Sequence, residues 1–221
     1  MYKTVIDYSE VLPTIHSMGV GFYRGVSHMK YELIPKIGRT NPDVTNQFER
    51  DMIGRFKDLA LPYLDRVPQD DWEWLALAQH HGMPTRLLDW TNNPFAGLYF
   101  AVGKDCSDDC ALYYFNGGRE VYRPSEESPF GIEDVLTFHP PHVTPRIAAQ
   151  WAVFTVHPKP GQAFQPHELQ KIVISGKLRW PIRRMLEKFG VHRASLFPGL
   201  DGVAAHLNYA IGDFYRKLRG E

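Results

Sequence analysis

One segment concentrates the side chains that can carry out chemistry. Residues 79–91 read QHHGMPTRLLDWT and hold two adjacent histidines, an arginine, an aspartate, a tryptophan and two threonines. Histidine titrates near neutral pH, so one of the pair can donate a proton to a substrate or accept one from it. An ordinary core segment has little use for so many polar groups. The segment is therefore either part of a catalytic centre or a polar scaffold that holds one together.

The two histidines come at the end of a helix that we expect over residues 71–80. Adjacent helical residues point about 100° apart, so only one of them is expected to face a given pocket. We choose His80 as the catalytic candidate, with a bond to loop carbonyls at the helix end as the alternative. His81 is expected to be structural. A helical HExxH pattern is absent from the sequence, and we predict that the protein binds no metal.

Arg86 to Asp89 is expected to be a strand. Alternation places Arg86 and Asp89 on opposite faces, so a regular strand does not bring the two together. Asp89 has two open roles. It can cap the following helix together with Thr91 or Asn93, or it can form a buried structural ion pair with Arg24.

An earlier strand, expected over residues 20–25 (VGFYRG), presents Tyr23, Arg24 and Gly25. The planar guanidinium of arginine donates two parallel hydrogen bonds to a phosphate. Glycine beside it allows a ligand to approach the backbone closely. We therefore expect Arg24 to bind an anion, with the structural ion pair to Asp89 as the alternative.

Three later residues complete the candidates. Gln150 carries an uncharged amide, which can accept a hydrogen bond and donate others. Glu168 and Asp201 are carboxylates, and Asp201 lies in the run FPGLDG. The alternative for Asp201 is a turn residue before the last helix.

The surrounding pattern predicts an α+β protein. Expected helices cover residues 42–64, 71–80, 94–102, 181–189 and 200–216. Expected strands cover residues 20–25, 86–89, 111–115, 152–157 and 169–175. Strands and helices do not alternate regularly enough for a doubly wound parallel sheet. We expect a single compact domain over residues 1–221, with a mixed or antiparallel sheet, flanking helices and a loop-rich excursion at about 116–145.

The totals exclude some classes of function. Lys plus Arg and Asp plus Glu are 25 each, so the formal net charge is zero. A neutral chain has no general attraction to nucleic acid or anionic membranes, although a local basic patch remains open. We expect a cytoplasmic protein without membrane contact, because no membrane-spanning run or leader pattern is present. Cys106 and Cys110 are expected to be free thiols, with half a metal site or a short bridge as alternatives.

Two motifs resemble the FRG domain family. The first is Phe22-Tyr23-Arg24-Gly25, and the second is QHHGMPTRLLDWTNNPFAGLYFA over residues 79–101. The segments 146–150 and 196–202 also fit the family pattern. The chain is therefore identified as a member of this family, with the resemblance covering most of its length.

The order of three elements is similar to that of ADP-ribosyltransferases. Arg24-Gly25 comes first, then LDWT running into an apolar helix, then Gln150 before a strand. The third element departs from that pattern, because Gln150 stands where those enzymes usually have a glutamate. The similarity implies cleavage of NAD through a ribosyl cation, with slow turnover unless another carboxylate compensates.

We hypothesise an enzyme that processes NAD or another nucleotide, of ADP-ribosyltransferase or NAD-glycohydrolase type, acting as a bacterial toxin or phage-defence effector. NAD would be a substrate, with no tightly bound cofactor and with a protein or nucleic-acid target. The catalytic candidates are Arg24, His80, Thr91 and Gln150, and the substrate-binding candidates are Tyr23, Gly25, Arg86, Asp89, Trp90 and Asp201. Two alternatives remain: a noncatalytic module that binds nucleotides or nucleic-acid ends, with stacking on Trp90 or Tyr23, and a purely structural polar network.

Overall fold

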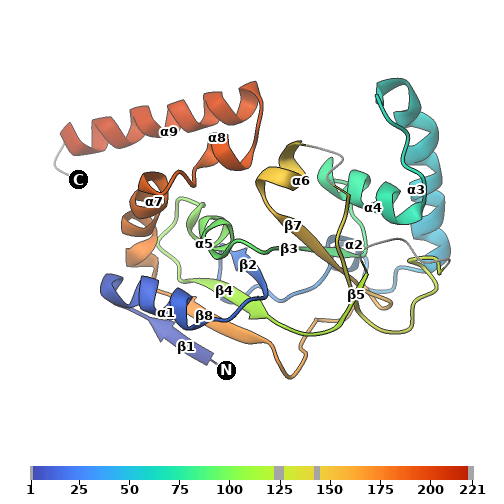
Figure 1. Ribbon diagram of the computed structural model, residues 1–221, viewed down its shortest axis with the longest axis horizontal. Coiled ribbons are helices and arrows are strands. Elements are labelled where there is room, and N and C mark those ends of the chain that lie inside the picture. Colours follow the sequence, from blue (N-terminus) through green and yellow to red (C-terminus); the bar gives the residue numbers. More distant parts are fainter. Residues whose placement is uncertain (1, 122–126, 142–144, 219–221) are drawn as a thin grey trace.

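A single mixed sheet runs through the protein. The computed structural model describes residues 2–121, 127–141 and 145–218 (Figure 1). The strands are β1 (Tyr2–Val5), β2 (Phe22–Val26), β3 (Leu87–Thr91), β4 (Cys110–Phe115), β5 (Arg119–Val121), β6 (Leu136–Phe138), β7 (Ala152–Val156) and β8 (Gln170–Ile174). They follow the order β1-β8-β4-β2-β3-β7-β6-β5. β1 and β5 run parallel to their neighbours β8 and β6, and all other pairs are antiparallel. The predicted α+β class is confirmed.

Helices flank this sheet at both ends. They are α1 (Val11–Ser17), α2 (Lys36–Thr40), α3 (Asn46–Ala60), α4 (Asp71–His80), α5 (Pro94–Val102), α6 (Pro145–Ala149), α7 (Arg179–Lys188), α8 (Arg193–Leu196) and α9 (Leu200–Leu218). In Figure 1, α1, α5 and α7 lie toward one end of the sheet, α3 and α4 toward the other, and α9 projects above. No helix in the described ranges is both long and apolar enough to cross a membrane.

The two helices of the central motif begin and end as their local sequence dictates. The Asp70 carboxylate accepts from the backbone N–H of Glu73, and so caps α4. Gly82 follows α4 with a φ of 84°, which a residue with a side chain rarely adopts. Asn93 caps α5 by accepting from the backbone N–H of Phe95, and proline occupies the first helical position. Both predicted helices are confirmed with these bounds.

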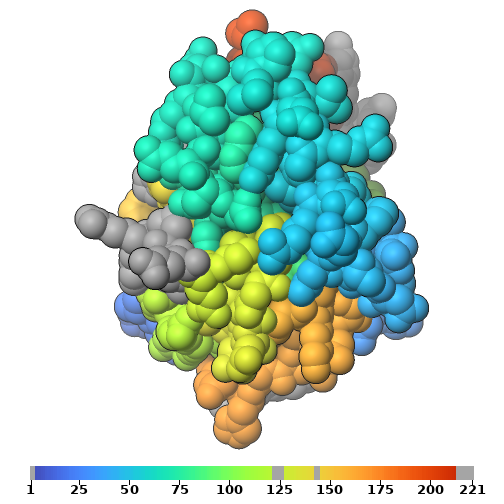
Figure 2. All heavy atoms as spheres, turned by 90° about the vertical axis from the view of Figure 1, so that its right-hand side faces the viewer, coloured from blue at the N-terminus to red at the C-terminus, as the bar shows by residue number. Residues whose placement is uncertain are grey.

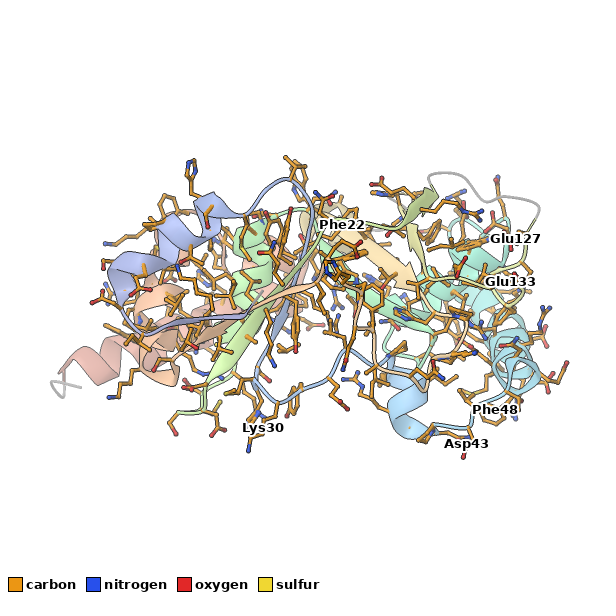
Figure 3. The ribbon with its side chains drawn as sticks, turned by 90° about the horizontal axis from the view of Figure 1, so that it is seen from below. Phe22, Lys30, Asp43, Phe48, Glu127 and Glu133 are labelled. Carbon is orange, nitrogen blue, oxygen red and sulfur yellow. The ribbon has the colours of Figure 1, made fainter. Side chains whose placement is uncertain are left out.

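α3 begins later than residue 42, where the sequence led us to expect the helix to start. Thr45 caps it, accepting from the backbone N–H of Phe48. Phe48, labelled in Figure 3, is 51% exposed, whereas Glu49 and Ile53 are buried. The helix turns a glutamate inward because a buried arginine of the central motif requires a partner, as described below.

The expected loop-rich excursion at 116–145 contains two strands of the sheet. β5 pairs with β6, and β6 pairs with β7 through Leu136↔Val156 to Phe138↔Phe154. Residues 122–126 and 142–144 of this excursion lie outside the described residues. Figure 2 shows the part around 127–141, in yellow-green, beside α3 in cyan. A hydrogen bond from the Asn46 side chain to the Phe130 carbonyl joins the two. This excursion therefore covers one end of the core.

β2 and α5 touch backbone to backbone. A Cβ atom built on Gly25 would lie 2.0 Å from the carbonyl oxygen of Gly97 and 2.3 Å from the backbone nitrogen of Ala101. The opposite face of the contact is equally tight, since a Cβ on Gly97 would lie 2.9 Å from Tyr23 Cβ. Gly25 also borders the cavity described below. Its absence of a side chain is nevertheless explained by helix packing, rather than by the approach of a ligand as the sequence led us to expect.

We predict that Gly25→Ala destabilises the protein by ~3 kcal/mol, because the added methyl meets backbone atoms that cannot rotate away. Urea denaturation of parent and variant measures the difference. Gly54→Ala on α3 is the matched control, since a Cβ there meets no atom within 4 Å. That control should be neutral or slightly stabilising. Equal stability of Gly25→Ala and the parent would contradict this account of the contact.

Candidate functional site

A cavity of about 440 Å³ opens where β2 and β3 diverge. These neighbouring strands share one pair in register, Tyr23↔Thr91, whereas β2 makes five such pairs with β4 and β3 makes five with β7. The cavity is lined by β2 beyond this pair, by β3 before it, and by residues of α2, α4, α5 and α6. The three elements singled out by the sequence therefore meet at one place, since β2, β3 and β7 are consecutive in the sheet.

Arg24 bridges the gap between the diverging strands. Its Nη1 donates to the backbone carbonyl of Asp89 at 2.5 Å and lies 3.4 Å from the Asp89 carboxylate. Its Nε is buried and has no hydrogen-bond partner in the part of the chain that is described. Burial lowers the pKa of the guanidinium, and the Asp89 carboxylate opposes that shift. A buried donor without a partner is rare in folded proteins, and a bound water or ligand atom is the usual explanation.

The cavity is strongly cationic. Arg24, Lys36, Arg39 and Arg146 all line it. Asp89 is the one carboxylate among the described residues of the lining. Lys36 is fixed by a hydrogen bond from Nζ to the Gly82 carbonyl at 2.6 Å. Because the whole chain is neutral, this excess of positive charge is a local feature, and it favours an anionic ligand.

Asp89 is held at the cavity by a residue to which the sequence assigned no role. Gln79 Nε2 donates to both carboxylate oxygens of Asp89, at 3.1 and 3.0 Å, and Gln79 Oε1 accepts from the Thr85 hydroxyl at 2.7 Å. Asp89 does not cap α5, because Asn93 does so with help from Thr91. Of the two roles left open, the contact with Arg24 is the one found, and it is partly exposed to the cavity rather than buried.

His80 lines the cavity, and the neighbouring His81 is exposed outside its lining. Burial lowers the pKa of His80 to about 4, with further lowering by the charges of Arg146 and His81 and an opposing effect of Asp89. The imidazole is therefore neutral at pH 7. In that form it offers one donor and one acceptor to a ligand.

Thr91 and Gln150 also border the cavity, and their polar groups are engaged within the protein. The Thr91 hydroxyl donates to the Gln150 carbonyl at 2.6 Å and accepts from the backbone N–H of Asn93 at 3.0 Å. The Gln150 side-chain nitrogen donates to the Leu196 carbonyl at 3.0 Å. This pair joins β3 to the turn before β7. The contacts position the cavity wall, and they leave the Thr91 proton unavailable to a ligand.

The aromatic candidates are less accessible than the sequence led us to expect. Tyr23 and Trp90 line the cavity but are 4% and 3% exposed, with their polar atoms bonded to the Gly19 carbonyl and the Thr155 hydroxyl. Tyr31, which the sequence did not single out, is 48% exposed and lines the cavity. It is thus better placed than either for stacking against a base.

Arg86 lies away from the cavity, in a buried network. Its Nε donates to Glu49 at 2.8 Å, its backbone N–H donates to the same carboxylate, and its remaining nitrogens reach Asn46 Oδ1 and the Pro129 carbonyl. Both charged side chains are at most 1% exposed. Burial raises the pKa of Glu49, and the Arg86 charge opposes that shift. Arg86 is a structural residue here, since it cannot reach a ligand without unfolding this network.

Asp201 and the cysteines also lie outside the cavity. Asp201 is an exposed residue in the first turn of α9, and Glu168 is exposed elsewhere, so neither adds a carboxylate to the lining. Cys106 and Cys110 are free thiols. Burial raises the pKa of Cys110 to about 11, which leaves it unreactive. The expectation that the protein binds no metal stays a prediction.

Comparison with known protein families gives a match over part of the chain. Residues 20–110 match the family model of the FRG domain, so the chain contains an FRG domain, as its motifs predicted. That range includes Arg24, Gln79, His80 and Asp89, whereas α6 with Arg146 lies beyond it. No curated protein and no solved structure matches the chain. The similarity to ADP-ribosyltransferases therefore stays a prediction.

We predict that Glu49→Gln lowers the free energy of unfolding by ~3–5 kcal/mol, because it leaves the Arg86 charge buried without a counter-ion. Chemical denaturation provides the measurement. Asp58→Asn, an exposed position on the same helix, is the control and should change stability little. A loss below ~1 kcal/mol at Glu49 would show that the buried pair is not what orients α3.

We also predict that stability falls as the solution is acidified from about pH 6.5 toward pH 3, through His157. This histidine is 3% exposed, its Nε2 lies 2.8 Å from the Thr155 hydroxyl, and burial lowers its pKa to about 3. The unfolded chain binds a proton below pH 6.5 that the folded chain does not bind until about pH 3. The contribution approaches ~1.4 kcal/mol per pH unit within that window.

The measurement for His157 is the unfolding free energy of parent and His157→Gln across this range. Carboxylates titrate in both proteins, so the difference between the two slopes isolates the histidine. Parallel curves would refute the assignment.

Proposed function

We propose that the cavity binds a phosphate-bearing nucleotide of the NAD class, and that the protein processes it as an ADP-ribosyltransferase or NAD glycohydrolase. The observation that carries this proposal is the set of four cationic side chains and one carboxylate in the described lining of a cavity of about 440 Å³. A volume of this size is typical of small-molecule sites. Arginine and lysine are the side chains that bind phosphate oxygens best.

The arrangement of the lining supports this ligand class. The cations come from three separate elements, β2, α2 and α6, which all contribute to the lining of one cavity. Neutral His80 supplies a donor and an acceptor for hydroxyl groups, and exposed Tyr31 supplies a ring for a base. A role as a bacterial toxin or phage-defence effector in the cytoplasm, acting on a protein or nucleic-acid target, extends the same proposal.

A noncatalytic module that binds nucleotides or nucleic-acid ends is the second candidate. Gln150 favours it, because its uncharged side chain already donates to the Leu196 carbonyl. Such a residue stabilises a ribosyl cation weakly. The two candidates share the same binding site and differ in turnover.

We predict that NAD, ADP-ribose or ATP binds to the protein and that Arg24→Gln weakens the dissociation constant at least about tenfold, since it removes charge-assisted hydrogen bonds. Isothermal titration calorimetry measures binding, and chromatography of released nicotinamide measures turnover. Arg146→Gln is a second variant, because Arg24 also joins two strands. Arg55→Gln, exposed on α3, is the control.

Higher salt should weaken binding as well, because the cations are partly exposed. Binding with release of nicotinamide supports the enzyme, and saturable binding without release supports the module. Absence of binding by all three nucleotides to the parent protein would end both proposals.

A further inference from the structure

A directional chain of hydrogen bonds runs from the core to the cavity. The Thr85 hydroxyl is fully buried and accepts from the backbone N–H of Leu87 at 3.2 Å, so its one proton is directed to Gln79 Oε1 at 2.7 Å. This contact fixes which end of the Gln79 amide faces outward. The amide nitrogen consequently points at Asp89 and contacts both of its oxygens. The geometry of the Asp89 carboxylate is thus set by Gln79 and Thr85, together with Arg24, whose Nη1 lies 3.4 Å from one carboxylate oxygen.

Asp89 is the one residue of β3 whose side chain is exposed. Leu87, Leu88, Trp90 and Thr91 are all buried, whereas the Asp89 side chain is 57% exposed. A polar residue at this position is therefore not required by packing. It presents the one carboxylate of the described lining to a cavity whose other charged side chains are cationic.

Resting on the function proposed above, we propose that Asp89 is the catalytic carboxylate of this site, and that Gln79 and Thr85 are its positioning residues. The sequence pattern pointed to Gln150 for this role. Gln150 has no charge and is committed to the Leu196 carbonyl, whereas Asp89 is charged, accessible and oriented. The donors on Asp89 leave part of its oxygens exposed for a water or a ribose.

The step that this assignment implies is hydrolysis of the bond between ribose and nicotinamide. NAD and water give ADP-ribose, nicotinamide and a proton. The C1′–N bond breaks, and its electron pair goes to the ring nitrogen, which becomes neutral. Water oxygen bonds to C1′ and gives its proton to Asp89, which passes it to solvent. The carboxylate stabilises the positive charge that develops on the ribose meanwhile.

The cations of the lining then hold the other half of the substrate. Arg39 lies close enough to Arg24 for their charges to interact, and Arg146 interacts in the same way with Asp89 and His80. Pyrophosphate bound among these groups leaves the ribose beside the carboxylate. This arrangement separates the residues that bind from the residue that acts, which makes the assignment testable.

The first test compares Asp89→Asn with the parent for NAD affinity by calorimetry and for nicotinamide release. We expect a dissociation constant within about threefold of the parent and a turnover number about 100-fold lower, since the amide keeps the shape but not the charge. Asp58→Asn on α3 makes the same chemical change at an exposed site, and should match the parent. Release by Asp89→Asn within twofold of the parent overturns the proposal.

The second test concerns the positioning residues. Thr85→Val and Gln79→Met should lower kcat about tenfold with KM unchanged, because they loosen the carboxylate without removing a cation. Thr85→Ser, which keeps the hydroxyl, should restore kcat. Melting temperatures confirm that the variants are folded. Equal kcat values for Thr85→Val and Thr85→Ser would overturn the positioning role.

Measurements of NAD binding and nicotinamide release distinguish the failure of this inference from the failure of the proposed function. A parent protein that releases nicotinamide independently of Asp89 retains the function and loses the inference. A parent that binds NAD without releasing nicotinamide overturns the catalytic role of Asp89 and leaves a binding module. A parent that binds no nucleotide overturns both.

Discussion

The hydrogen bond from the Arg24 guanidinium to the backbone of Asp89 is the contact on which this structure depends. β2 and β3 lie side by side in the sheet yet pair in register only at Tyr23↔Thr91. Beyond that pair, a side chain replaces the backbone ladder. Removing the Arg24 guanidinium from water costs free energy. That cost is offset because the guanidinium contacts both the backbone carbonyl and the carboxylate of Asp89. The cavity opens where β2 and β3 separate beyond this pair.

The central motif serves two purposes on two sides of one strand. On one side, Arg86 and Glu49 form a buried ion pair that orients α3 and ties the 127–141 segment to the core. On the other side, Gln79 and Asp89 face the cavity. Arg86 precedes β3, Asp89 lies within it and Gln79 lies at the end of α4, so one short sequence contributes both to the stability of the fold and to the lining of the cavity.

Local signals were sufficient for some features and insufficient for others. The starts of α4 and α5 follow from Asp70 and Asn93, which cap these helices and directly precede them in the sequence. The inward turn of Glu49 could not be predicted, because its cause lies 37 residues away. Lys36, Arg39 and Arg146 were missed as cavity residues for the same reason. Neighbouring residues do not reveal that short helices from distant parts of the chain converge over one gap in the sheet.

The cavity draws its walls from both halves of the chain, between Tyr23 and Phe154. Contacts of such long sequence separation form late, since the loops between them must close first. During synthesis from the N-terminus, the matched FRG segment emerges well before α6 and β7. A nascent chain that ends before Arg146 therefore holds the motif without a finished enclosure. The cavity is therefore enclosed only after translation has passed that point.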